Sequence, residues 1–327
     1  MQHDLTVAIC AYNCEKYIEE TLDCIVNQSF QKFDLLIVNV CSTDNSEQII
    51  TSFFNKKPRK YNLINFKTNL GLAAGRKYVE NSVSSKYIIF IDADDCPHPN
   101  MFERLYYKIN SDEDLMAVGC YLEFIDSNGL KIKGGQFLGD KTKASFLKRA
   151  RDKKLIFLAS NAIFNRQIAN SVGGRSTDGF FSGMPRYQDL CEDLDLWTRM
   201  SDLYKFGKAI IVIPEVLISY RKHSQGLSSS SFNMFLRMNH IKTNLLLRRE
   251  GLSQKSFKEF FNNLSDEQIN SLKLKSRAAD NLRNAVFFFR EGKWLNSVLS
   301  LLKSIILNPI YFLQKVRANT KIFNKNL

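Results

Sequence analysis

The sequence predicts an α/β protein with a mainly parallel sheet and helices on both faces, followed by a helical C-terminal region. Short apolar runs alternate four times with segments of helical spacing between residues 5 and 91. Polar clusters stand directly after three of these runs, and the chain from residue 229 onward has a helical pattern to its end. Because helix-connected parallel strands end at one edge of the sheet, we expect these polar clusters to meet there.

Each element follows from a local residue pattern. Residues 5–11 and 87–91 are short apolar runs suited to buried strands, whereas residues 15–28 place Ile18, Leu22 and Ile25 at helical spacing. The other expected strands are 33–40, 61–66, 115–125 and 208–220; the other expected helices are 45–54, 70–83, 141–152 and 190–204; and residues 173–187 are an expected loop.

The net positive charge of the chain arises in its last third. Residues 1–220 hold 27 Lys and Arg against 27 Asp and Glu, while residues 221–327 hold 19 against 6. The whole net charge of +13 therefore falls in the tail. A neutral body with a basic tail indicates a binding or catalytic core with an electrostatic adaptor. We expect no nucleic-acid partner, because the basic and aromatic residues of the tail follow helix packing and not a stacking platform.

The seven cysteines show no zinc-binding spacing and no CxxC pair. We expect them to be reduced, buried or half-buried thiols of a cytoplasmic protein. The first residues lack the pattern of a signal peptide, and no run of 18 apolar residues predicts a membrane-spanning helix.

Asp92, Asp94 and Asp95 are the sharpest chemical feature. Three carboxylates within four residues repel one another unless a cation lies among them, and they directly follow the apolar strand at 87–91. Oxygen ligands of this kind suit Mg²⁺ or Mn²⁺, which commonly bridge a diphosphate. The alternative is a solvated acidic turn ahead of Pro97.

A second acidic pair, Glu192 and Asp193, stands at the start of an expected helix. A carboxylate near a metal-bound phosphate is suited to act as a general base for an incoming hydroxyl, although a charged first helical turn is the alternative. His223 follows the last expected strand of the body of the chain. Its imidazole is suited to bind Mn²⁺, and the alternative is a structural histidine that binds no metal.

Six segments together resemble the inverting family 2 glycosyltransferases of the GT-A fold, a Rossmann-like nucleotide-binding fold with a mixed, mainly parallel sheet. They occur in the order typical of that family and cover about residues 4–228. The segments are VAICAYN at 7–13, LLIVNVCSTDNS at 35–46, NLGLAAGRKYVENS at 69–82, YIIFIDADDCPHPNMFE at 87–103, CEDLDLWTRM at 191–200 and ISYRKHSQGLS at 218–228.

The resemblance implies transfer of a sugar, with inversion, from a nucleotide donor that is usually UDP-linked, aided by Mn²⁺ or Mg²⁺. It implies a catalytic domain over 1–228, with a nucleotide-binding half over 1–110 and a donor-sugar and acceptor half over 111–228. It also implies a role for each matching residue: Asp193 as general base, Asp94 at the ribose and metal, Asp95 and His223 at the metal, Asp92 as support for the acidic cluster, and Tyr12 beside the nucleobase. Arg76 is a further candidate for offsetting the charge of the diphosphate.

One position departs from the family pattern. The segment that usually reads Asp-Asp-Gly-Ser-Thr-Asp is here Asn39-Val40-Cys41-Ser42-Thr43-Asp44. Val40 cannot accept the hydrogen bond that the second acid normally takes from the nucleobase, so we expect Asn39, whose amide both donates and accepts, to substitute. A scaffold that has lost catalysis and a sugar nucleotidyltransferase are the alternatives; the retained carboxylates and the lack of a Gly-rich phosphate loop favour an active glycosyltransferase.

The tail, residues 229–327, shows apolar residues at helical spacing with basic residues around them. One interpretation is an amphipathic surface resting on an anionic membrane, where a lipid-linked acceptor would be met, at the inner face of the cell membrane. The alternatives are a homodimer interface and packing on the body of the chain. The acceptor is expected to be a glycan or lipid-linked glycan of cell-surface polysaccharide or lipopolysaccharide.

Overall fold

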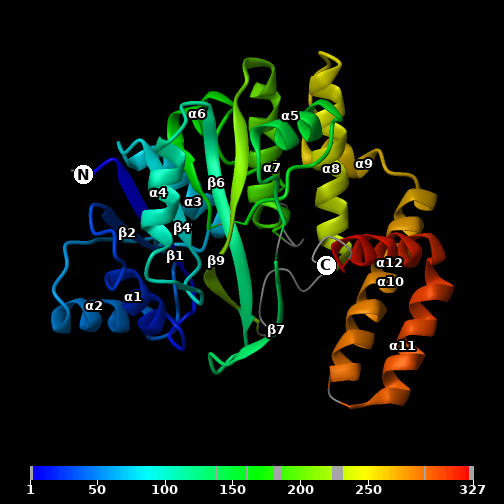
Figure 1. Ribbon diagram of the computed structural model, residues 1–327, viewed down its shortest axis with the longest axis horizontal. Coiled ribbons are helices and arrows are strands. Elements are labelled where there is room, and N and C mark those ends of the chain that lie inside the picture. The colour runs from blue at the N-terminus through cyan, green and yellow to red at the C-terminus, as the bar shows by residue number, and fades with distance from the viewer. Residues whose placement is uncertain are drawn as a thin grey trace. The chain divides into compact units, whose positions relative to one another are not determined.

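A computed structural model describes residues 3–136, 138–159, 161–179, 186–222, 231–290 and 292–323 (Figure 1). The chain divides into two compact units. Unit 1 comprises Met1–Gly226 together with Ile241–Gln254, and unit 2 comprises Leu227–His240 together with Lys255–Leu327.

Unit 1 is built on a mixed nine-stranded sheet, in the order β3-β2-β1-β4-β8-β6-β9-β5 with β7 paired to β6. Its first half is parallel, because each strand is joined to the next by a helix. In register, Val7 lies opposite Leu35 on one side and Ile89 on the other. These strands are β1 (Leu5–Ala11), β2 (Asp34–Asn39), β3 (Asn62–Asn65) and β4 (Tyr87–Ile91).

The second half of the sheet changes direction. The short strand β8 (Ile163–Asn165) runs antiparallel to β4 and to β6 (Leu115–Ile125), while β9 (Ala209–Arg221) runs parallel to β6. Two short strands complete it: β5 (Cys96–Pro97) pairs with β9, and β7 (Lys131–Gln136) pairs with β6. The expected fold class, a mixed sheet with flanking helices and a helical C-terminal region, is confirmed.

Helices flank the sheet (Figure 1), and their apolar residues are buried. In the helix at Ile18–Val26, for example, Ile18, Leu22 and Ile25 are all fully buried, as the spacing predicts. The helices of unit 1 are α1 (Ile18–Val26), α2 (Ser46–Lys56), α3 (Leu72–Ser82), α4 (Met101–Asn110), α5 (Lys143–Arg151), α6 (Arg166–Ser171), α7 (Glu192–Met200) and the short helices η1 (Tyr187–Asp189) and η2 (Ser201–Phe206).

The elements that the sequence did not predict are mostly short. Strands β5 and β8 have two and three residues, too few for a periodic pattern to be visible. Helix α4 has ten residues and a clear buried face at Phe102, Leu105 and Ile109, so its pattern was present in the sequence and was missed. Strand β7 is largely exposed and carries two glycines, which weaken any strand pattern.

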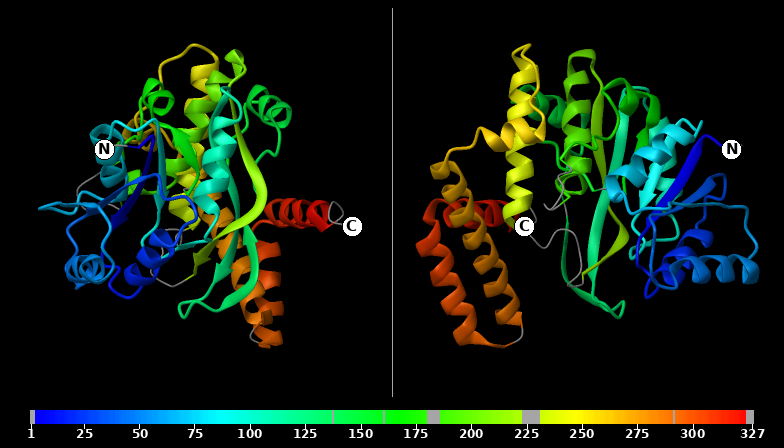
Figure 2. Two further views of the ribbon diagram at one scale, coloured as in Figure 1. Left: turned by 60° about the vertical axis from the view of Figure 1, so that its left-hand side comes forward. Right: turned by 180° about the vertical axis from the view of Figure 1, so that it is seen from behind.

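Unit 2 consists of helices (Figure 2). They are α8 (Ser231–Arg249), whose last residues belong to unit 1, α9 (Phe257–Asn262), α10 (Asp266–Arg290), α11 (Trp294–Leu307) and α12 (Pro309–Phe323). Helices α10 and α11 lie side by side as a hairpin. Over the described residues, no single helix is long and apolar enough to cross a membrane. Helices α11 and α12 together have sufficient length and apolarity, but the chain bends by 116° between them.

Two of the seven cysteines are joined. Cys24 of α1 and Cys96 of β5 form a disulfide with a Cα–Cα distance of 5.6 Å. The expectation that all seven are thiols is therefore wrong for this pair. It closes a loop of 72 residues and ties α1 to the segment that follows the acidic turn at Asp92–Asp95.

We predict that alkylation of the denatured chain without reductant modifies only the five free cysteines, whereas reduction exposes all seven. Reduction should lower the free energy of unfolding by about 2–4 kcal/mol, because the crosslink restricts the unfolded chain. Cys41→Ser, at an unpaired and half-buried cysteine, is the control and should leave the stability close to that of the oxidised protein. Seven alkylated residues without reductant would contradict the disulfide.

Candidate active site

Polar residues that follow β1 and β2 form hydrogen bonds with one another, as we expect for parallel strands that end at the same edge of the sheet. Asn13 follows β1 in the left-handed region with φ 47°, and its side-chain oxygen accepts a hydrogen bond from the Thr43 amide at 2.8 Å. In return the Asn13 amide donates to Ser42 Oγ at 3.1 Å. Tyr12 is 48% exposed, so its ring is free to contact a ligand at this edge.

Asn39 and Val40 are both buried beneath this edge. The Asn39 side chain donates from Nδ2 to Asn65 Oδ1 at 3.0 Å, and its Oδ1 accepts from the backbone amide of Ser42 at 3.0 Å. The side chain of Asn39 therefore holds the loop after β2. Val40 is 2% exposed and packs close to Gly75. Cys41 stands where the family pattern has glycine and keeps the left-handed conformation, with φ 62°.

The three acidic residues of the turn after β4 differ in their surroundings. Asp92 is half-buried and forms an ion pair with Arg76. Asp94 is half-buried, and Asp95 is fully buried. The two oxygens of Asp95 accept from the Arg221 amide at 3.0 Å and from Asn161 Nδ2 at 3.4 Å. Burial and the neighbouring carboxylates raise the pKa of Asp95 well above its usual value.

Arg221, at the end of β9, stabilises the acidic turn through hydrogen bonds. Its Nε donates to the carbonyl oxygen of Asp94 at 2.9 Å, and its Nη2 pairs with Glu20 of α1 at 2.6 Å. The guanidinium lies over the ring of Tyr17, 4.7 Å from its centroid. Because Arg221 is only 3% exposed, its role is to fix the turn between β4, β9 and α1.

A buried network of charges connects the acidic turn to helix α7. Arg76 of α3 is 3% exposed and pairs with both Asp92 and Glu192. Glu192 also pairs with Arg175, which is fully buried and bonds Glu80 through Nε at 2.7 Å. The guanidinium of Arg76 is held between two carboxylates of the protein, and its expected role of offsetting the charge of a diphosphate stays a prediction.

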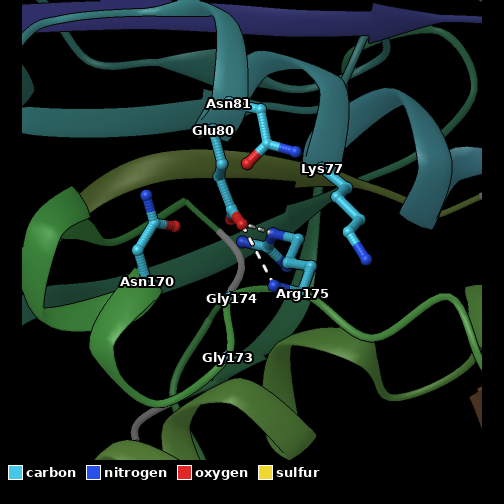
Figure 3. Close-up of a pocket in the computed structure, with 7 residues that line it drawn as sticks. All are labelled: Lys77, Glu80, Asn81, Asn170, Gly173, Gly174 and Arg175. Atoms are coloured by element: carbon cyan, nitrogen blue, oxygen red, sulfur yellow. Dashed lines mark hydrogen bonds and ion pairs between the residues drawn. The ribbon is translucent and has the colours of Figure 1, made fainter.

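Figure 3 shows one end of this network, where Glu80 of α3 faces Arg175. The adjoining cavity has a volume of about 290 Å³ and contains none of the residues expected to bind the donor. It is lined by Lys77, Glu80, Asn81, Asn170, Gly173, Gly174 and Arg175.

Asp189 fixes the start of helix α3. Its Oδ1 accepts from the Ala73 amide at 2.8 Å and thus caps a helix more than a hundred residues away. Gly71 leaves room for this carboxylate, since a Cβ there would lie 2.4 Å from Asp189 Oδ2. This cap therefore joins α3 to the short helix η1, and the pair of Arg76 with Glu192 joins α3 to α7.

Asp193 follows Glu192 in the first turn of α7 and is half-buried. Burial raises the pKa of its carboxyl above the ordinary 3.8, against the opposing pull of the Arg76 guanidinium. Helix α7 itself is firmly anchored, because Trp197 is fully buried and packs edge-on against Phe164 at 5.5 Å. Two residues on, Asp195 pairs with Arg199 at 2.8 Å, so the two aspartates have different surroundings.

The acidic residues fit a divalent cation only in part. Among the described residues, no three His, Cys, Asp or Glu side chains come together as ligands. Asp94 is half-buried, whereas both oxygens of Asp95 are already bonded to the protein. His223 lies outside the described residues. A cation would therefore rest on Asp94 with most of its ligands from a diphosphate, an arrangement that Mg²⁺ and Mn²⁺ commonly adopt.

The structure thus brings Asp92 together with Glu192, the neighbour of Asp193, and gathers Asn13 with Ser42 and Thr43. Arg175, Glu80 and Asp189 were not predictable from the sequence. An arginine after two glycines and a glutamate within a helix carry no local signal of pairing, because Arg175 and Asp189 meet α3 only when the segment after α6 and the short helix η1 pack on it.

The sheet and the carboxylates at its edge define the GT-A class of glycosyltransferases. A family model described as Glycosyl transferase family 2 matches residues 6–173, just over half of the chain. The chain therefore belongs to glycosyltransferase family 2. An uncharacterized glycosyltransferase of Haemophilus influenzae is 29% identical over 227 residues, covering 69% of this chain and 67% of that protein.

Solved structures share the fold. S. aureus TarS 1–349 in complex with UDP-GlcNAc has a TM-score of 0.54 and 17% identity, covering 91% of this chain and 90% of that one. The mannosyltransferase PcManGT of Pyrobaculum calidifontis, in complex with GDP-Man and Mn²⁺, has a TM-score of 0.53 and 16% identity, covering 95% and 88%. The hyaluronan synthase of Pasteurella multocida is 23% identical over 78% of this chain, which spans only 24% of that protein.

We predict that Glu192→Gln lowers the free energy of unfolding by about 3 kcal/mol. The substitution leaves two buried guanidiniums, Arg76 and Arg175, with one anion fewer between them. Asp23→Asn, in the exposed pair with Lys57, is the matched control and should have little effect. Denaturant unfolding of both variants measures the difference, and equal midpoints would show that the network does not stabilise the fold.

Proposed function

We propose that this protein transfers a sugar, with inversion, from a UDP-linked donor to a hydroxyl of a glycan or lipid-linked acceptor. The observation that carries the proposal is the position of Asp193: a half-buried carboxylate of raised pKa, one residue from the network that reaches the acidic turn. A carboxylate held in this way is suited to general-base catalysis at a sugar donor bound across the turn.

In the proposed reaction the acceptor oxygen forms a bond to the anomeric carbon on the face opposite the diphosphate. The bond between that carbon and the diphosphate oxygen breaks, and the nucleoside diphosphate leaves with the electron pair. Asp193 takes the proton of the acceptor hydroxyl. The pairs around Glu192 hold the start of α7, so Asp193 needs little reorganisation to reach this geometry.

The donor is proposed to bind at the ends of β1, β2 and β4. Tyr12 is exposed there and is suited to flank the nucleobase. Asn39 supports the nucleobase site by holding the loop at Ser42, because its own amide is engaged. A UDP donor is supported by TarS, whose structure contains UDP-GlcNAc, although PcManGT contains GDP-Man on a similar fold.

Mn²⁺ or Mg²⁺ is proposed to bind with Asp94 as its main protein ligand, and when bound it offsets the charge of the leaving diphosphate. Asp92 and Asp95 hold the turn that presents Asp94, through Arg76 and Arg221. His223 remains a proposed ligand. The hydrogen bonds of Asp95 favour a supporting role for it over the direct coordination expected from the sequence.

The acceptor is proposed to belong to a cell-surface polysaccharide, assembled at the cytoplasmic face of the cell membrane. The relatives support this class, since they include the hyaluronan synthase of Pasteurella multocida. The donor sugar depends on residues that shape the pocket around the anomeric carbon.

We predict that Asp193→Asn abolishes sugar transfer, at least a thousandfold, while UDP binding stays within about threefold of wild type. In the wild-type protein, transfer should fall as the pH drops through the pKa of Asp193, because the base acts as a carboxylate. Since burial raises that pKa, the acid limb should lie above the range of an ordinary aspartate.

The readouts are radiolabelled sugar transfer and calorimetric UDP binding, with Asp23→Asn as the control. Near-wild-type transfer by Asp193→Asn would assign the base to another residue.

We predict that UDP binds more tightly in the presence of Mn²⁺ than without it, and at least tenfold more tightly than GDP or CDP. Asp94→Asn should remove most of the gain from Mn²⁺, because it removes the proposed anionic ligand. Isothermal titration calorimetry measures both effects. Preference for GDP would correct the donor class, and a folded protein that binds none of the three nucleotides would favour a non-catalytic scaffold.

A further inference from the structure

Helices α11 and α12 expose many large apolar side chains, and we call seven of them the α11–α12 face. Leu295 is 72% exposed, Ile306 80% and Ile310 68%. Single exposed apolar residues are ordinary on protein surfaces, but a group at the helical spacing of residues 295, 298, 302 and 306 marks an interaction surface. The face consists of Trp294, Leu295, Val298, Leu302 and Ile306 of α11 with Ile310 and Leu313 of α12.

The opposite side of α11, which packs on α10, is made of small polar residues. Ser304 is fully buried and donates from Oγ to the carbonyl oxygen of Ala278 at 2.8 Å. Ser297 donates in the same way to Ala285 at 2.8 Å. Ala278 and Ala285 are themselves buried, so serines and alanines form the seam between the two helices.

This arrangement reverses the usual pattern of a helix in water, which buries its leucines and exposes its serines. A seam of small residues with large apolar side chains outward is typical of helices surrounded by lipid, where leucine gains nothing by turning inward. The large apolar side chains of the hairpin are therefore available to contact an apolar environment outside the protein.

The charges around the α11–α12 face indicate which apolar environment it contacts. Residues 293–327 contain no Asp or Glu and six Lys or Arg. Lys293, Lys303 and Lys315 are exposed on the described part of this segment. A second copy of the chain would bring the same basic residues against one another, whereas an anionic lipid surface would attract them.

We propose that the α11–α12 face docks on an anionic phospholipid bilayer. Helix α11 has 14 residues, a length of about 21 Å, which is short of the roughly 30 Å hydrocarbon core. Its bend of 116° with α12 prevents the pair from continuing as one rod. The helices therefore lie within the headgroup boundary with their apolar side chains directed into the acyl region.

The two tryptophans make the proposal measurable in the full-length protein. Trp197 is fully buried in unit 1, whereas Trp294 lies on the α11–α12 face and is 63% exposed. Vesicles of phosphatidylcholine with about a third phosphatidylglycerol should shift the emission of Trp294 to shorter wavelength, and brominated lipids should quench it. Vesicles of phosphatidylcholine alone should bind at least tenfold more weakly, and raised salt should weaken binding to the anionic vesicles.

A triple variant, Leu295→Asn, Leu302→Asn and Ile306→Asn, should reduce vesicle binding at least tenfold. All three side chains are at least half exposed, so the change removes little packing. The matched control places Asn at Leu130 and Phe206, which are 66% and 73% exposed in unit 1, and should bind vesicles as the wild type does. Circular dichroism verifies that each variant is folded.

Several outcomes would overturn the proposal. These are equal binding by the triple variant, no binding of the wild type to anionic vesicles, and a dimer in light scattering that the triple variant abolishes. The last would assign the face to a second copy. Because UDP binding does not depend on this face, a protein that binds UDP but not vesicles separates failure of this inference from failure of the proposed function.

Discussion

The placement of Glu192 between two buried arginines determines the geometry of the rest of the site. Three carboxylates and two guanidiniums form the network, so it retains a small negative charge inside the protein. A buried charge is tolerated only when its partners are in place, which means that α3, β4 and α7 assemble in one arrangement or not at all. Asp193 inherits its position from this assembly, and its raised pKa follows from the same burial.

Three of the four non-glycine residues with positive φ in the described chain lie near the ends of β1 and β2 or at the start of α7. Asn13, Cys41 and Cys191 all take left-handed conformations although none is glycine, with φ of 47°, 62° and 55°. Asn13 and Cys41 each stand two residues after a strand, and Cys191 stands directly before α7; the chain changes direction there and brings polar groups to the edge of the sheet. Such conformations persist only where surrounding contacts over-determine them. The bonds of Asn13 to Ser42 and Thr43 supply that constraint for the first two loops.

The parts of this site that could be predicted from the sequence are those with a local residue pattern. The apolar strands, the acidic turn and the segment at Glu192 and Asp193 are visible because a periodic or clustered pattern lies within a few residues. The burial of Arg76 and the pairing of Arg175 were not predictable, since they depend on residues about a hundred positions apart. The disulfide was missed for the same reason, because Cys24 and Cys96 become neighbours only when α1 packs beside β5.

Unit 1 and the α10–α11 hairpin of unit 2 differ in which side chains they bury. In unit 1 the strands bury nearly every apolar side chain, and Trp197 and Phe164 close the core beneath α7. In unit 2 the seam between α10 and α11 uses alanine and serine, which pack closely but remove little apolar surface from water. The large apolar side chains of α11 therefore contribute little to the stability of the hairpin in water. The exposed apolar face of α11, beside exposed lysines, is explained by contact with a surface outside the chain. The charge distribution of the sequence agrees with this explanation, because the body is neutral and the net positive charge falls in the C-terminal part.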